Sequence, residues 1–319
     1  MLYLGVDLGG TNIKAALCDG SGQILREASC PTNLPRSAES VCDAIAKLCL
    51  GLMRQAGCGA GDVGGLGVGC PGTVDAKTGM VLYSNNLGWR SFAMGEYLQS
   101  KISLPVTLAN DANAAGYGEA LAGCAKNAES AVILTLGTGV GGGVVLGGRL
   151  LTGYTGAAAE PGHMVINDAS DAPLCTCGRR GCLEAYASAT ALIRMTKEAM
   201  ATNPASVMHT LAAKNGVDGR TAFDAKAAGD AAGKAVVAQY VHYLALGVAN
   251  LINVFFPQIV GLSGGVANQG EVLLNPLRAE VAPLVFGHAF APKQTEIICC
   301  TLGYRAGVIG AALLAGAQR

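Results

Sequence analysis

One histidine and three cysteines form the group of residues with the most specific chemistry in this sequence. His163 precedes the segment 175–182, Cys-Thr-Cys-Gly-Arg-Arg-Gly-Cys, which supplies Cys175, Cys177 and Cys182. One imidazole and three thiolates complete a tetrahedral Zn²⁺ shell, and four protein ligands leave no open position for a catalytic water. The pattern therefore predicts a structural zinc ion. A redox disulfide in the Cys-x-Cys pair is the alternative.

Two carboxylates lie close in sequence to the predicted zinc ligands. Glu160 precedes His163, and Glu184 follows Cys182. A bound metal would hold these two side chains near one another, and carboxylate oxygens accept hydrogen bonds from the hydroxyls of a polyol.

Two glycine-rich turns follow apolar runs in separate parts of the chain. The run 2–7 leads through Asp7 into a Gly-Gly-Thr turn, and the run 131–136 leads into a Gly-Thr-Gly turn. Glycines let backbone N–H groups approach an anion, a threonine adds a hydroxyl donor, and Asp7 could hold Mg²⁺ through water. A tight hairpin that needs positive φ is the alternative. The predicted polyphosphate contacts are Asp7, Gly9, Gly10, Thr11, Asn12, Gly137, Thr138, Gly139, Gly141, Gly142 and Gly143.

The second turn contains a literal G-x-G-x-x-G, the fingerprint of a dinucleotide site. That fingerprint requires a following helix, whereas residues 144–146 and the pair Gly147-Gly148 predict another strand and hairpin. We therefore expect the match, and an oxidoreductase activity based on it, to be false. A third glycine turn, Gly264-Gly265 after the predicted strand 259–262, suits close approach of a nucleoside, and a helix-start loop explains it equally well.

Asp111 stands between a predicted strand, 106–110, and a predicted helix, 112–121. Capping is the usual role of an aspartate at such a place. Asp111 could also act as a general base, because the helix dipole favours an ionised carboxylate in the first turn. Its position at the C-terminal end of a strand is where α/β proteins bind ligands.

The elements that position these residues follow a repeated pattern. Strands at 2–7, 13–18 and 24–29 are separated by glycine turns, and the pattern recurs at 131–136, 144–146 and 149–151 with an offset of 128 residues. Two similar halves explain this recurrence. Further strands are predicted at 65–70, 106–110 and 258–263, and helices at 38–56, 92–101, 112–121, 188–201, 206–213, 222–227, 231–253 and 305–315, with a strand–glycine–helix segment over 259–281. Alternating strands and helices predict a partly parallel α/β sheet in each half, with a soft boundary near residue 110 and a ligand site in the cleft between the domains.

Composition sets the class of protein. The 319 residues suffice for two domains, and 51% of them are hydrophobic. Lys+Arg and Asp+Glu are both 22, so the composition lacks the basic excess that is typical of a nucleic-acid-binding protein. The N-terminus carries no basic segment ahead of an apolar one, so we expect a cytoplasmic protein with mostly reduced cysteines. The apolar stretch 241–262 contains polar residues and Pro257, which favours a buried helix followed by a strand over a membrane span.

These motifs together resemble the ROK family of sugar kinases and repressors, within the actin-like ATPase superfamily. The resemblance rests on residues 7–11, 110–111, 137–143, 160–163 and 175–184, and it covers nearly the whole chain. It implies two actin-like (ribonuclease H-like) α/β domains with an interdomain cleft and a zinc knuckle. It also implies ATP, Mg²⁺ and a structural Zn²⁺ as cofactors, and a homo-oligomer, dimer or tetramer.

The resemblance also implies roles for individual residues. Asp111 would be the catalytic base, and the hexose would contact Asn110, Asp111, Glu160, His163 and Glu184, with the loop of Gly72 and the segment of Asn86 beside it. The C-terminal helix would return to the first domain, giving domains of 1–110 with 303–319, and 111–302. Ala159 departs from the glycine that many members have before the glutamate.

The implied activity is ATP-dependent phosphorylation of a hexose. Fructokinase-like relatives tend to have a histidine in the knuckle, and its absence here favours glucose. N-acetylmannosamine, mannose, fructose or allose are other possible acceptors, and a non-catalytic, sugar-responsive regulatory protein is the alternative from another class. The repressor branch carries a helix-turn-helix ahead of the first phosphate loop, whereas strand 1 is expected from residue 2, so we expect no DNA binding.

Overall fold

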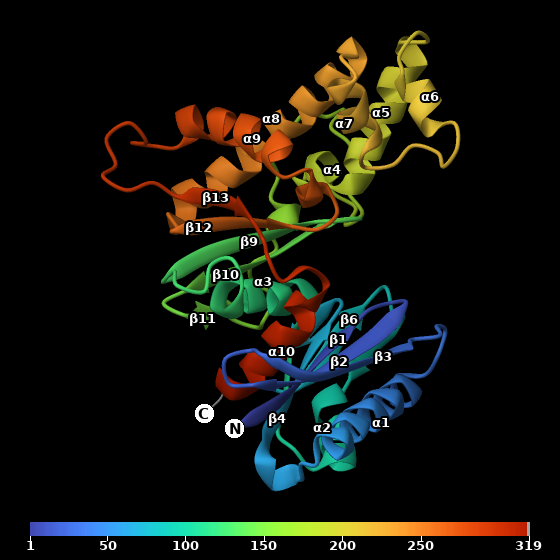
Figure 1. The fold of residues 1–319 in the computed structure, drawn as a ribbon, viewed down its shortest axis with the longest axis vertical. Coiled ribbons are helices and arrows are strands. Elements are labelled where there is room, and N and C mark those ends of the chain that lie inside the picture. The colour runs from blue at the N-terminus through green and yellow to red at the C-terminus, as the bar shows by residue number, and fades with distance from the viewer. Residues whose placement is uncertain (318–319) are drawn as a thin grey trace. The chain divides into compact units, whose positions relative to one another are not determined.

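The computed structural model describes residues 1–317 as an α/β fold (Figure 1). By its contacts the chain forms two compact units. The first unit is Met1–Ile133, Gly142–Ala159 and Thr301–Arg319, and the second unit is Leu134–Gly141 and Glu160–Cys300. The expected domains, 1–110 with 303–319 and 111–302, follow the sequence repeat instead, and that division stays a prediction. Residues 318 and 319 lie outside the described part of the chain.

The first unit is built on a five-stranded sheet in the order β3-β2-β1-β4-β8. Its strands are β1 (Leu2–Leu8), β2 (Asn12–Asp19), β3 (Ile24–Pro31), β4 (Val63–Cys70) and β8 (Val106–Asn110). β1 is antiparallel to β2 and parallel to β4, and β4 is parallel to β8. The glycine turns between the first three strands make the antiparallel meander, as the sequence predicted.

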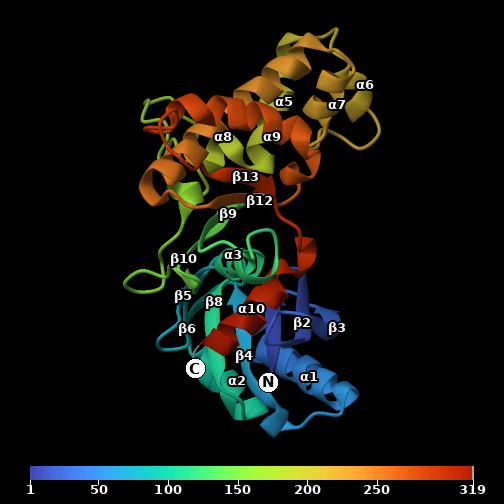
Figure 2. The same cartoon turned by 60° about the vertical axis from the view of Figure 1, so that its left-hand side comes forward.

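Helices cover both faces of this sheet. α1 (Ala38–Ala56) and α2 (Met94–Ile102) pack on one face, and α3 (Asp111–Ala122) and α10 (Ala306–Ala317) on the other, as Figure 1 and Figure 2 show. On β1 the side chains Leu4, Val6 and Leu8 join the apolar cluster under α1. The intervening Gly5 faces α10, so one strand serves two layers.

Glycines, which have no side chain, let α10 pack close to the sheet. A Cβ on Gly67 would lie 1.8 Å from the Ala311 carbonyl oxygen, and one on Gly5 would lie 1.9 Å from that of Val308. The first unit therefore contains the C-terminal helix as an integral layer. Part of the high glycine content is explained by this packing.

A second five-stranded sheet has the order β11-β10-β9-β12-β13. Its strands are β9 (Ser130–Leu136), β10 (Val140–Leu146), β11 (Arg149–Leu150), β12 (Ile259–Ser263) and β13 (Glu296–Cys299). A three-strand meander occupies one edge, and later strands, of which β12 and β13 are parallel, occupy the other. The first sheet has the same arrangement, as expected from the sequence repeat.

The second unit is rich in helices. They are α4 (Glu184–Ala187), α5 (Ala189–Thr202), α6 (Met208–Ala212), α7 (Thr221–Ala227), α8 (Ala231–Phe255) and α9 (Glu271–Val281). α8 is long and apolar enough to cross a membrane, but 61% of its most apolar window is buried within the structure. It contacts α5, α7 and α9, which is the environment of a core helix.

The sequence missed several short strands. A separate sheet, β5-β6-β7, is formed by β5 (Thr73–Asp75), β6 (Met80–Ser84) and β7 (Trp89–Phe92). Because Phe92 ends β7, α2 begins at Met94 and not at the predicted residue 92. β5, β7 and β13 have three or four residues each, which is too few alternations for the pattern to show a strand.

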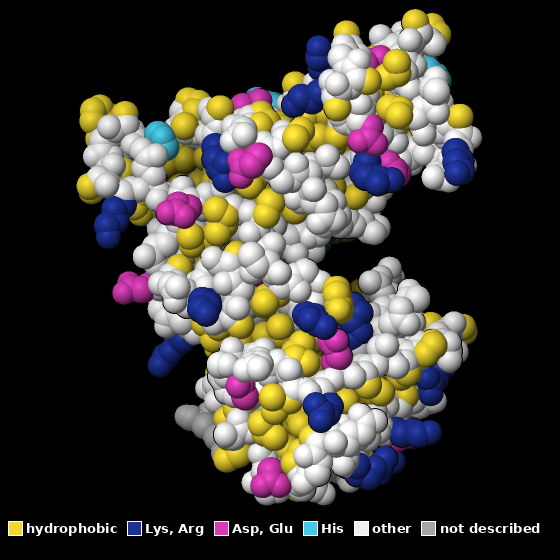
Figure 3. Space-filling view, in the orientation of Figure 1, with side chains coloured by type: hydrophobic (Ala, Val, Ile, Leu, Met, Phe, Trp, Pro, Cys, Tyr) yellow, Lys and Arg dark blue, Asp and Glu magenta, His cyan; other side chains and the backbone are white. Residues whose placement is uncertain are grey.

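The surface carries no dominant charge on the face shown in Figure 3. Lysine and arginine side chains are interspersed there with aspartate and glutamate. This distribution agrees with the formal net charge of zero.

Candidate functional site

The first glycine turn is held from beneath by Thr32. This buried residue donates its backbone N–H to the Thr11 carbonyl at 2.8 Å and its hydroxyl to the Gly9 carbonyl at 2.7 Å. The carbonyls of Gly9 and Thr11 are therefore occupied, while the N–H groups of Gly10 and Thr11 have no partner in the part of the chain that the structure describes. Outward N–H groups on a fixed turn are suited to an anion.

Fold geometry alone does not require glycine at the tip of this turn. Neither Gly9 nor Gly10 has a positive φ, and a Cβ on Gly10 would meet no atom within 4 Å. The alternative of a hairpin that needs positive φ is therefore wrong here. Space left open above free N–H groups points to a ligand.

Asp7 ends its strand beside two other charged groups of the first unit. The Lys14 ammonium lies 3.9 Å from the Asp7 carboxylate, across the hairpin. Burial raises the pKa of Asp7, Lys14 lowers it, and the charge of Asp111 raises it further. The structure thus places Asp7 and Asp111 within electrostatic reach of each other. A divalent cation would favour the ionised form of these buried carboxylates, so the residues fit Mg²⁺.

Asn110 caps α3, not Asp111. The Asn110 side-chain oxygen accepts from the N–H groups of Ala112 and Asn113 at 2.9 and 3.1 Å. One oxygen of Asp111 accepts from Ala112 at 2.9 Å. Burial raises the pKa of Asp111 despite these hydrogen bonds, opposite to the direction expected from the helix dipole alone. With the cap supplied by its neighbour, the Asp111 carboxylate keeps an oxygen for other chemistry.

Asn110 also ties the Gly72 loop to this helix start. Its side-chain amide donates to the Gly72 carbonyl at 3.1 Å. Gly72 has φ +108°, and a Cβ there would lie 2.2 Å from the Tyr83 carbonyl, so only glycine fits. Asn86 lies exposed in the turn between β6 and β7. The structure therefore brings Gly72 to Asn110, whereas the Asn86 side chain lies exposed.

The second glycine turn, in the second unit, is built like the first. The start of α5 occupies its carbonyls, because Ala189 N–H donates to Gly137 and the Thr190 hydroxyl to Thr138, both at 2.8 Å. The N–H groups of Thr138 and Gly139 have no partner in the described part of the chain. A Cβ on Gly137 would again meet nothing within 4 Å.

The glycines that follow belong to a strand and not to the turn. β10 begins at Val140, four residues before the predicted strand start, so Gly141, Gly142 and Gly143 lie within it. A Cβ on Gly143 would lie 3.2 Å from the Gly116 Cα of α3, which gives packing as the reason for that glycine. A strand in place of a helix confirms that the G-x-G-x-x-G match is not a dinucleotide fingerprint.

The predicted zinc ligands converge in the second unit. The ligand atoms of His163, Cys175, Cys177 and Cys182 all lie within 4.8 Å of one another. Cys177 and Cys182 Sγ are 3.7 Å apart, and Cys175 Sγ is 3.6 Å from His163 Nδ1. Tetrahedral zinc requires separations of about 3.8 Å between sulfurs and about 3.6 Å between sulfur and nitrogen. The residues fit Zn²⁺, and all three cysteines are free thiols.

Two glycines shape the knuckle around these ligands. Gly178 and Gly181 have φ of +86° and +78°, conformations that favour glycine. Cys177 is exposed, and although desolvation acts to raise its pKa, hydrogen bonds from the Arg179 backbone and guanidinium and from the neighbouring cysteines outweigh this and lower the pKa to about 6. A thiolate, the form that binds zinc, is thus available at neutral pH.

Glu184 connects the knuckle to the second glycine turn. One carboxylate oxygen accepts from the Thr176 hydroxyl at 2.5 Å and lies 3.4 Å from Cys175 Sγ. The other accepts from Val140 N–H at 3.1 Å, and a Cβ on Gly139 would lie 2.3 Å from it. A side chain at position 139 would therefore displace the Glu184 carboxylate.

Glu160 precedes a short 3₁₀ turn, Pro161–His163, of which His163 is the last residue. A Cβ on Gly162 would lie 1.9 Å from the Val140 carbonyl, so this turn packs tightly on β10. Ala159, just before, has φ +61°, the left-handed conformation that costs a non-glycine residue about 1 kcal/mol. The departure noted in the sequence therefore falls on strained backbone.

The third glycine turn is also constrained by packing. Gly264 has φ +89°, and a Cβ there would lie 2.4 Å from the Leu136 carbonyl. Gly265 has open space. The turn leads into a 3₁₀ helix, Val266–Gln269, which agrees with the helix-start alternative.

Two side chains beside the predicted residues were missed. Lys14 is the cross-strand partner of Asp7, and the symmetry of the hairpin about its turn could have located it. Thr176 holds Glu184 from within the knuckle, and only its place between two cysteines hinted at this.

The similarity to known proteins extends over nearly the whole chain. A family model described as the ROK family covers residues 3–318. The chain belongs to the ROK family. The glucokinase of Halalkalibacterium halodurans is 36% identical over 99% of this chain and 95% of the relative.

Solved structures give the same result for this ROK protein. A ROK family glucokinase from Streptomyces griseus, in complex with glucose and AMPPNP, is 34% identical, with a TM-score of 0.80 over 99% of this chain and 100% of that one. The ROK hexokinase from Thermus thermophilus is 34% identical, with a TM-score of 0.83 over 100% and 99%. The xylose repressor of Bacillus subtilis is 29% identical over 96% of this chain and 75% of the repressor.

Proposed function

We propose that this ROK protein is an ATP-dependent hexokinase whose acceptor is glucose, phosphorylated at its 6-hydroxyl to glucose 6-phosphate. The observation that carries the proposal is the shared build of the two glycine turns: carbonyls are tied back, two successive N–H groups are free, and a glycine in each turn, Gly10 and Gly137, has open space. The glucokinases among its relatives support the choice of acceptor.

The two turns would bind the phosphates of ATP. Gly10 and Thr11 from one turn, and Thr138 and Gly139 from the other, offer backbone N–H groups to phosphate oxygens. Mg²⁺, held near Asp7 when bound, supplies charge neutralisation to the phosphates. Gly264 and Gly265 would lie against the nucleoside, where Gly265 has room.

Asp111 would accept the proton of the attacking sugar hydroxyl. Burial and the cap supplied by Asn110 leave its carboxylate ready for this role. Asn110, Glu160, His163 and Glu184 would bind further hydroxyls, with Gly72 and Asn86 in neighbouring loops. His163 directs Nδ1 at the cysteines, which leaves Nε2 for the hexose.

Zn²⁺ in the knuckle would be structural. His163, Cys175, Cys177 and Cys182 would hold it, and the ion would fix the backbone around His163 and Glu184. The fit of two interatomic distances to tetrahedral geometry supports this site.

A hexose panel tests the proposal. Coupled ADP release with ATP and Mg²⁺ should give the highest kcat/KM for glucose over mannose, N-acetylmannosamine, fructose and allose, because acceptor choice is a difference in transition-state binding. A higher value for another hexose would replace glucose as the acceptor. Hexose binding without any ADP release would support the regulatory alternative, which the xylose repressors among the relatives favour.

The pH dependence of turnover follows from Asp111. Burial raises the pKa of this carboxyl above its usual 3.8, and a general base works only when ionised. We therefore expect kcat to fall with decreasing pH through a limb that lies above 3.8. The limb is located by measuring kcat across pH with saturating substrates. If the residual activity of Asp111→Asn shows no such limb, the limb is assigned to Asp111. A limb that persists unchanged in the variant would belong to another group.

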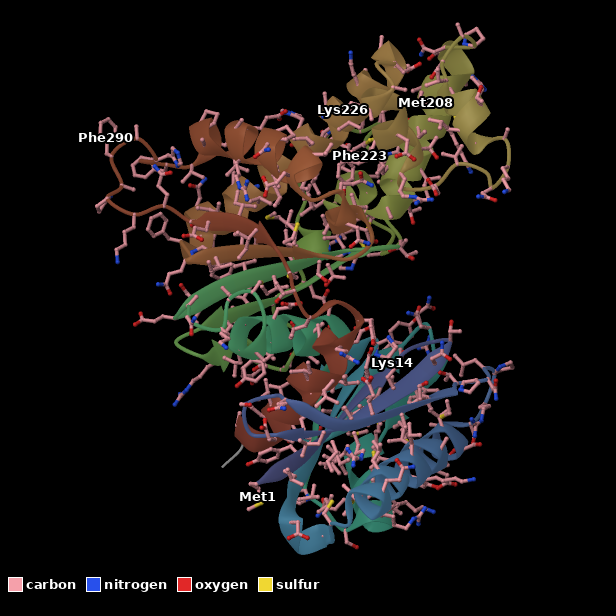
Figure 4. The ribbon with its side chains drawn as sticks, in the orientation of Figure 1. Met1, Lys14, Met208, Phe223, Lys226 and Phe290 are labelled. Carbon is pink, nitrogen blue, oxygen red and sulfur yellow. The ribbon has the colours of Figure 1, made fainter. Side chains whose placement is uncertain are left out.

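We also propose a cytoplasmic homo-oligomer, dimer or tetramer. Phe286 and Phe290 are 94% and 90% exposed in one loop of the second unit, where Figure 4 labels Phe290, and such apolar exposure suits an interface. Light scattering measures the mass in solution, and a monomer would contradict this state.

A further inference from the structure

A carboxylate outside the predicted site fixes the chain that borders Asp7. Glu119, near the end of α3, is 0% exposed. Its Oε1 accepts from Leu302 N–H at 2.7 Å, and its Oε2 accepts from Thr301 and Cys124 N–H at 3.1 Å each. No lysine or arginine pairs with it in the described part of the chain. Three backbone N–H groups therefore hold this buried carboxyl group.

The segment that Glu119 holds leads directly to Asp7. From Thr301 the chain makes a 3₁₀ turn, Gly303–Arg305, and enters α10 at Ala306. A Cβ on Gly307 would lie 2.9 Å from the Asp7 carboxyl carbon. The first turn of α10 thus forms a wall against this carboxylate.

The same turn also borders the lysine beside Asp7. Lys14, labelled in Figure 4, lies 5.6 Å from the centre of the Tyr304 ring as well as 3.9 Å from Asp7. Arg305 pairs with Glu27 on β3 at 2.7 Å. Tyr304 and Gly307 therefore border both charged groups.

We infer that Glu119 is a positioning residue for Asp7 and Lys14, acting through the start of α10, and so sets the affinity for the metal–nucleotide complex. The inference rests on the proposed function of the Asp7 turn. A carboxylate offers acceptors to all three N–H groups, whereas glutamine would turn an NH₂ donor toward at least one of them. The resulting shift of residues 301–307 would reach Asp7, because Gly307 leaves no free space there.

The test compares Glu119→Gln with Leu98→Ala, a destabilising change in the buried core of the same unit that touches none of these residues. The dissociation constant of Mg·ATP is measured directly by calorimetry, with that of glucose alongside. We expect Glu119→Gln to weaken Mg·ATP about tenfold and glucose less than about twofold. Leu98→Ala should lower Tm and leave both constants unchanged.

An unchanged Mg·ATP constant in Glu119→Gln, with a lowered Tm, would overturn the inference and leave Glu119 a purely structural residue. If Glu119→Gln does not fold, Glu119→Asp, which keeps the charge but shortens its reach, is judged by the same criterion. Weakened Mg·ATP binding in a protein whose wild type phosphorylates no hexose would remove the proposed function and leave this inference standing.

Discussion

Asp111→Asn should lose about 10²–10⁴-fold in kcat, or roughly 3–5 kcal/mol of transition-state stabilisation, while still binding glucose. The amide cannot take a proton from the sugar hydroxyl, but its oxygen can keep the hydrogen bond from Ala112 N–H that Asp111 makes now. Stability should not fall. Burial raises the pKa of Asp111, so keeping its carboxylate ionised in the folded protein at neutral pH costs folding free energy. A neutral isostere removes that cost.

The matched control is Asp224→Asn, the same chemical change on the exposed face of α7. It should leave kcat and Tm at wild-type values. Turnover is measured by ADP release, and glucose binding by calorimetry. A kcat for Asp111→Asn within tenfold of the wild type would remove Asp111 from the role of base.

Cys182→Ser should abolish zinc binding and lower the thermal stability of the second unit. Cys182 is 0% exposed, and its sulfur lies 3.7 Å from that of Cys177. Structural zinc in finger peptides binds with about 10–16 kcal/mol, which is an upper bound for the loss. Activity should fall about 10–100-fold, because Thr176, which stands between two zinc ligands, holds Glu184 beside the second glycine turn.

Zinc content by elemental analysis and Tm by calorimetry measure these effects. Cys30→Ser, a change at a half-buried cysteine of the first unit, is the control and should keep its metal. Purified wild-type protein without zinc, and with a mass that shows an oxidised cysteine pair, would favour the disulfide alternative instead.

Site features that are local in sequence could be predicted. The four zinc ligands lie within 20 residues of one another, and the glycine turns directly follow strongly apolar strands. Both patterns carry their geometry with them, because a hairpin or a knuckle is closed by the residues that it contains. The three-strand meanders and the helices were predictable for the same reason.

Features that depend on tertiary contact could not be predicted. Glu119 reads as an ordinary polar residue of a helix, and only the return of the chain at Thr301 and Leu302 gives its carboxylate partners. The sequence predicts Gly143 to be part of a phosphate loop, whereas in the structure it packs against Gly116. In both cases the deciding neighbour comes from a distant part of the chain, and single-sequence patterns hold no signal for it.

The packing of α10 has a consequence for biosynthesis. β1 and β4 present Gly5 and Gly67 to a helix that the ribosome makes only after the entire second unit. Until Ala306–Ala317 emerges, the first unit lacks one of its layers, and its glycine-lined sheet face stays open to solvent and to other nascent chains. The unit that is translated first is thus completed last. A release of the chain before α10 would leave an aggregation-prone intermediate rather than a working half.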